Sequence, residues 1–130
     1  MRKILLLDDN TMSCENSLEV LEKVYEVHKC KEILSAVRRI GLVKYDLFII
    51  DLMMPTKGLD NLDEFSAGFN FYNKYIKDDY KETPVLFWTN LTDGSFKAFQ
   101  ADSGRSNLYY LQKSDDDNAL LEFIKNNIKL

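Results

Sequence analysis

The chain is poor in the residues that build disulfide frameworks and transition-metal sites. Its 130 residues include two cysteines, Cys14 and Cys30, and one histidine, His28. Two thiols so far apart in sequence exclude a disulfide-rich scaffold and a zinc site of the usual spacing, and we expect both to be buried and reduced. Because no second histidine is present, we expect His28 to be a solvated or hydrogen-bonded residue on an edge strand.

Long apolar runs and an excess of basic residues are missing too. No stretch approaches the roughly 20 apolar residues of a membrane span. The apolar run that follows Arg2 and Lys3 ends at Asp8 and Asp9, so it is too short for an export signal. The net charge is −4, whereas binding to phosphate backbones needs a basic face. We therefore expect a cytoplasmic protein that binds neither membranes nor, directly, nucleic acid.

Short apolar runs recur along the chain, and each one ends at polar residues. Runs of this length without internal charges are typical of strands buried on both faces of a parallel sheet. The run after Tyr25 is half-polar and suits a sheet edge. The predicted strands are Ile4 to Leu7, Tyr25 to Cys30, Asp46 to Asp51, Val85 to Trp88 and Leu108 to Leu111.

Segments with apolar residues at helical spacing separate these runs. Residues 52–66 show no clean period and are expected to form a loop. Ser114 is predicted to be the N-cap of the last helix, since the acids at 115–117 favour the positive helix end. The predicted helices cover residues 12–24, the segment from Ile33 to Gly41, Phe69 to Ile76, a short stretch with Phe96 and Phe99, and Leu120 to Ile128.

This alternation predicts a single α/β domain over residues 1–130, with no repeat, no linker and no output domain. Its architecture is (βα)5, a flavodoxin-like, doubly wound parallel sheet of strand order 2-1-3-4-5 with helices on both faces. In such sheets the functional groups gather at the carboxyl ends of the strands, near the point where the strand order reverses. That point lies between the first and third strands.

Polar side chains stand at four of these strand ends: Asp8 and Asp9, Asp51, Thr89 and Lys113. Three carboxylates in one cleft repel each other unless a cation neutralises them or one of them takes up a proton, and an all-oxygen set favours Mg²⁺. Lysine and threonine can stabilise the oxygens of a transferring phosphoryl group, and an aspartate can be the nucleophile. The set fits Mg²⁺-dependent phosphoryl transfer onto an aspartate.

Four motifs at these strand ends resemble those of the response-regulator receiver domain of two-component signalling. Taken in order and spacing, the resemblance covers essentially the whole chain. The motifs are Leu-Leu-Leu-Asp-Asp-Asn, Asp-Leu-Met-Met-Pro, Phe-Trp-Thr-Asn and Tyr-Tyr-Leu-Gln-Lys-Ser. The resemblance implies that Asp51 is the phosphoacceptor, and that Asp8, Asp9, Asp51 and the backbone carbonyl of Met53 hold Mg²⁺.

The same resemblance implies that Lys113 contacts the phosphoryl group and that Thr89 hydrogen-bonds it. Tyr110 matches the family's switch aromatic, which turns inward with Thr89 and changes a protein-binding surface. The implied partners are a histidine kinase or histidine phosphotransfer protein as donor and a downstream protein as target. The chain would act as a monomer or weak dimer.

Three features depart from the family pattern. Ser114 follows the lysine where a proline is usual, and Asn90 follows Thr89 where a small residue is usual. The loop at residues 56–67, before Gly68, is longer than the family norm. These departures keep open a receiver-like binding module that no longer depends on phosphate.

An aspartyl phosphatase of the haloacid-dehalogenase type is the other alternative. That chemistry needs a second aspartate two residues after the nucleophile, where this chain has Asn10 or Thr11. We therefore expect no enzyme acting on a separate substrate, only a domain that catalyses its own phosphorylation and dephosphorylation.

Overall fold

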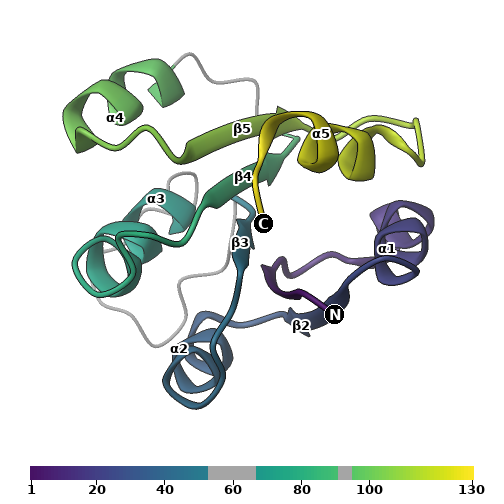
Figure 1. The fold of residues 1–130 in the computed structure, drawn as a ribbon, viewed down its shortest axis with the longest axis horizontal. Helices are drawn as coiled ribbons and strands as arrows, with labels where there is room; N and C mark the ends of the chain where they lie inside the picture. The colour runs from purple at the N-terminus through teal and green to yellow at the C-terminus, as the bar shows by residue number, and fades with distance from the viewer. Residues whose placement is uncertain (53–66, 91–94) are drawn as a thin grey trace.

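A five-stranded parallel sheet forms the centre of the molecule (Figure 1). The computed structural model describes residues 1–52, 67–90 and 95–130, apart from the side chains of Ser13 and Ser95. The strand order β2-β1-β3-β4-β5 confirms the predicted fold class. The strands are β1 (Lys3–Leu7), β2 (Glu26–Cys30), β3 (Leu47–Ile50), β4 (Val85–Thr89) and β5 (Leu108–Gln112).

Helices cover both faces of the sheet, as the buried strands require (Figure 1). One face carries α1 (Glu15–Glu22) and α5 (Ala119–Asn127), and the other carries the remaining helices. A short 3₁₀ turn, η1 (Met12–Cys14), precedes α1. The helical segments of the other face are α2 (Ile33–Leu42), α3 (Ala67–Phe71), the π-helical turn η3 (Tyr72–Ile76) and α4 (Ser95–Ser103).

Alternate residues of each central strand enter opposite halves of the core. On β4, Leu86 and Trp88 pack with α1 and α5, whereas Val85 and Phe87 pack with α2 and α3. All four residues of β3 are buried, because helices cover both of its sides. This arrangement fixes which face each side chain at the strand ends can reach.

The edge strand and the two thiols agree with expectation. His28 lies on the edge strand β2 and shares hydrogen bonds with the hydroxyl of Tyr45 (2.7 Å) and the carboxylate of Glu26 (3.0 Å). Cys14 and Cys30 are both buried and form no disulfide. Among the parts of the chain that the structure describes, no helix is both long and apolar enough to cross a membrane.

The predicted N-cap at Ser114 is wrong, because α5 begins at Ala119 and Asn118 occupies the cap position. The Ser114 hydroxyl accepts a hydrogen bond from the amide of Asp116 (3.4 Å), and the Asp116 carboxylate accepts one from the amide of Asn118 (3.0 Å). Such local bonds from side chain to backbone compete with the helix. The chain therefore makes two tight turns before α5 starts.

Candidate functional site

Asp8 is the most deeply buried member of the site. It follows β1, its amide donates to the carbonyl of Cys30 (3.0 Å), and it is 0% exposed. One carboxylate oxygen accepts a hydrogen bond from the amide of Asn10 (2.9 Å). Burial raises the pKa of Asp8, against hydrogen bonds from Lys113 and Asn10 that lower it. The fold therefore holds this carboxylate in a position where its charge is costly.

Asp51 follows β3, at the strand end beside Asp8. Its amide donates to the carbonyl of Leu7 (2.9 Å), and the residue is 7% exposed. Gly68, at the start of α3, packs directly against its backbone. A Cβ atom at Gly68 would lie 2.5 Å from the carbonyl oxygen of Asp51, which is closer than any side chain allows. The position of Asp51 thus depends on a glycine at residue 68.

Asp9 completes an acidic cluster with Asp8 and Asp51. Each of the three residues offers a carboxylate oxygen, and these oxygens lie within 4.8 Å of one another. Asp9 is exposed, whereas the other two are buried, so the cluster opens to solvent on the side of Asp9. The donor set is oxygen only and carries up to three negative charges, which fits a hard divalent cation such as Mg²⁺.

Lys113 supplies the positive charge of the site. Its ammonium donates to Asp8 Oδ2 (2.5 Å) and to Asp51 Oδ2 (3.3 Å), and its side chain is 7% exposed. Burial opposes the charge, but the hydrogen bond and ion pairs with Asp8 and Asp51 outweigh it and raise the pKa of Lys113. The lysine is therefore cationic at neutral pH.

The predicted phosphate and switch residues lie on the neighbouring strands. Thr89 ends β4, is 0% exposed, and its carbonyl accepts the amide of Lys113 (2.8 Å). Tyr110 is half-buried on β5, on the sheet face opposite to α1 and α5, and its ring lies 5.4 Å from that of Phe96. The roles of Thr89 and Tyr110 stay predictions. Met53 lies outside the described residues, as does the loop at 56–66.

The fold is similar to that of solved response-regulator structures over nearly the whole chain. The chemotaxis protein CheY4 of Vibrio cholerae shares 24% identity and a TM-score of 0.74, covering 97% of this chain and 98% of its own. The chain has the fold of a receiver domain. No family model and no curated protein matches the sequence.

Two further structures with this fold were solved with a beryllium fluoride group. The BeF3-activated DrrB receiver domain has 21% identity and a TM-score of 0.73, covering 97% of this chain and 96% of its own. The response regulator TrrA of Thermotoga maritima, solved in complex with Mg(2+)-BeF, has 22% identity and a TM-score of 0.71, covering 97% of this chain and 98% of its own. At these identities the likeness establishes the receiver fold and leaves the chemistry to this chain's own residues.

Two contacts of this receiver fold were not anticipated from the sequence. One is the close approach of Gly68 to the backbone of Asp51. The other is between Lys113 and Trp88, because the Lys113 ammonium lies 5.1 Å from the centroid of the Trp88 ring. The alternation of side chains along strands could have predicted this second contact, since it places Trp88 and Lys113 on the same face of the sheet.

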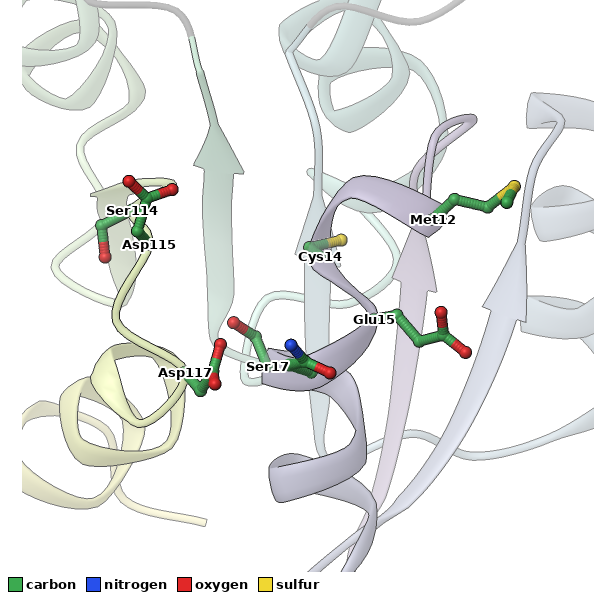
Figure 2. A pocket seen from close by; sticks show the side chains of 8 residues that line it. Met12, Cys14, Glu15, Ser17, Ser114, Asp115 and Asp117 are labelled. Carbon is green, nitrogen blue, oxygen red and sulfur yellow. The ribbon is translucent and has the colours of Figure 1, made fainter.

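A polar cavity of about 260 Å³ lies beside the site, between the start of α1 and the segment that leads to α5 (Figure 2). Cys14 and Ser17 line it from one side, and Ser114, Asp115 and Asp117 from the other. Burial raises the pKa of Cys14, so its thiol is protonated and weakly nucleophilic at neutral pH. Glu15, Asp115 and Asp117 give the cavity acidic walls, which disfavour an anion.

Proposed function

We propose that the chain is a phosphoacceptor signalling domain that takes a phosphoryl group from a phosphohistidine onto Asp51. The observation that carries the proposal is Lys113 hydrogen-bonded to both Asp8 and Asp51 inside a receiver fold. Burying a lysine and two aspartates costs desolvation energy that their attraction does not reliably recover. Stability alone therefore gives no reason for this arrangement, whereas phosphoryl transfer does.

In the proposed reaction a carboxylate oxygen of Asp51 attacks the phosphorus atom of the donor. A P–O bond forms while the P–N bond to the imidazole breaks, and the bonding electron pair returns to the imidazole nitrogen. Lys113 stabilises the negative charge on the equatorial oxygens, and the Thr89 hydroxyl donates to one of them. A Mg²⁺ ion held by the acidic cluster would supply further positive charge at these oxygens.

The output of the proposed domain is a change in a protein-binding surface. Tyr110 lies on β5 against Phe96 of α4, so a movement of the tyrosine alters the surface over α4 and β5. The partners would be a histidine kinase or histidine phosphotransfer protein and a downstream target. The domain would act in the cytoplasm and catalyse only its own phosphorylation and dephosphorylation.

The fluorescence of Trp88 tests this proposal, because the residue is 3% exposed and its ring lies beside the Lys113 ammonium. We expect the emission to change with Mg²⁺ and again with beryllofluoride plus Mg²⁺, and the second change to vanish in Asp51→Asn. Absence of both changes would favour a phosphate-independent binding module. Steady hydrolysis of small phosphate esters would favour a phosphatase.

A further inference from the structure

Trp88 and Lys113 lie on the same face of the sheet, on neighbouring strands. Trp88 of β4 is paired with Leu111 of β5, and side chains two residues apart point to the same face. Lys113 therefore leaves the end of β5 on the side of Trp88, at the diagonal position that long and aromatic side chains can span. Both side chains are almost fully buried, since Trp88 is 3% exposed and the Lys113 side chain 7%.

The path of the lysine side chain explains what the indole does. Lys113 starts on β5, and its acceptors stand on β3 and β1, so the side chain must cross β4. Neighbouring strands are about 4.8 Å apart, and a lysine has four rotatable bonds before its ammonium. Trp88 stands on the strand that is crossed. Its ring centroid is 5.1 Å from Nζ, within the range of a cation–π interaction that strengthens where water is excluded.

An aromatic ring attracts the ammonium without accepting one of its conventional hydrogen bonds. The ammonium has three N–H donors, and within the described part of the chain two of them have acceptors, on Asp8 and Asp51. A carboxylate or carbonyl in place of the indole would take the third donor, and a carboxylate would also add negative charge beside the acidic cluster. With the indole, the third donor stays available for an incoming phosphoryl oxygen.

We propose that Trp88 is a positioning residue for Lys113, holding its ammonium over the end of β4 so that it meets the phosphoryl group on Asp51. The inference rests on the proposed function and deepens it. In this role Trp88 acts through the lysine and takes no direct part in the transfer. The indole thereby becomes part of the machinery of phosphorylation as well as of the core between the sheet, α1 and α5.

The test compares Trp88→Leu and Trp88→Phe with the native chain, using a small phosphoryl donor, saturating Mg²⁺ and intact mass to follow phosphorylation. Leucine keeps an apolar side chain without a π face, and phenylalanine keeps a weaker π face. We expect Trp88→Leu to lower the phosphorylation rate about tenfold, which corresponds to about 1.4 kcal/mol. The phosphorylation rate of Trp88→Phe should lie between those of Trp88→Leu and the native chain. In both variants, calorimetry should find an affinity for Mg²⁺ within about twofold of the native value.

The same Trp88 substitution in a chain that lacks Lys113 separates an effect on lysine position from an effect on core packing. In Lys113→Met the ammonium is gone, so Trp88→Leu should have no further effect on the rate. Phe87→Leu is the matched control, because it removes a buried aromatic ring from the opposite face of the same strand. It should lower stability and leave the rate of phosphorylation unchanged.

Two results would overturn the inference alone: equal rates in the native chain and Trp88→Leu, or the same rate loss with and without Lys113. A native chain that is never phosphorylated would overturn the proposed function and this inference with it.

Discussion

The ammonium of Lys113 lies 2.5 Å from a carboxylate oxygen of Asp8, although 105 residues separate the two in sequence. The sheet produces this contact, because Asp8 follows β1 and Lys113 follows β5 at the same rim. Asp8 is fully buried, and the lysine reaches Asp51 as well. Folding of the chain therefore buries the charged groups of the proposed site, and their interactions affect its stability.

Removing Lys113 should destabilise the fold. Lys113→Met leaves two buried aspartates without their cation, and breaking a buried ion pair typically costs about 3 to 5 kcal/mol. We expect a loss of about 3 kcal/mol in the free energy of unfolding, measured by urea denaturation without Mg²⁺. Asp8→Asn combined with Lys113→Met should lose less than Lys113→Met alone. A loss below about 1 kcal/mol in the free energy of unfolding of Lys113→Met would contradict a stabilising role for these buried ion pairs.

The substitutions Gly68→Ala and Gly41→Ala should change the free energy of unfolding in opposite directions. At Gly68 the new Cβ would stand 2.5 Å from the Asp51 carbonyl oxygen, so α3 or Asp51 must move, at a cost of roughly 1 to 3 kcal/mol. At Gly41, in α2, nothing lies within 4 Å of the new Cβ, and alanine should stabilise the helix by about 0.5 to 1 kcal/mol. Urea denaturation measures both, and similar effects at the two sites would refute the close approach.

Mg²⁺ should stabilise the native chain, because it neutralises the acidic cluster only in the folded state. At a concentration 100 times its dissociation constant, a ligand adds about 2.7 kcal/mol to the free energy of unfolding. We expect thermal unfolding to shift upward by several degrees in MgCl2 relative to NaCl of equal ionic strength. Asp9 is exposed, so Asp9→Asn should fold normally and lose most of the shift. An equal shift in Asp9→Asn would rule the cluster out as the binding site.

Alkaline pH should destabilise the fold through its thiols. Burial raises the pKa of Cys14 and of Cys30 above the usual thiol value, so above roughly pH 8.5 the unfolded chain ionises first. The folded chain then binds more protons than the unfolded chain, and stability falls as pH rises. Urea denaturation between pH 8 and 10 should show a smaller fall in Cys14→Ala/Cys30→Ala than in the native chain. Parallel pH profiles would mean that the thiols contribute nothing.

The strands were predictable because they depend on local patterns, and their order followed from the flavodoxin-like topology that alternating strands and helices indicate. Uninterrupted apolar runs mark strands buried on both faces, and parallel strands bring Asp8, Asp51 and Lys113 to one rim whatever the details of the loops. The segment 12–24 was predicted as one helix, and the structure has a 3₁₀ turn at Met12–Cys14 before α1. Helix boundaries depend on single hydrogen bonds, and the spacing of apolar residues does not determine these.

What the sequence could not supply were contacts between distant segments and choices between competing hydrogen bonds. Ser114 has the chemistry of an N-cap, but its hydroxyl accepts the Asp116 amide before any helix begins. The need for glycine at residue 68 comes from the packing of α3 on Asp51. Trp88 reads as an apolar strand residue until the lysine is seen to lie over its ring.

The mass of the intact chain after reaction with a small phosphoryl donor and Mg²⁺ tests the central claim most directly. The account predicts the gain of one phosphoryl group, located on Asp51, lost on treatment with hydroxylamine as an acyl phosphate should be, and absent from Asp51→Asn. An unchanged mass in the native chain, or an equal gain in Asp51→Asn, would contradict it.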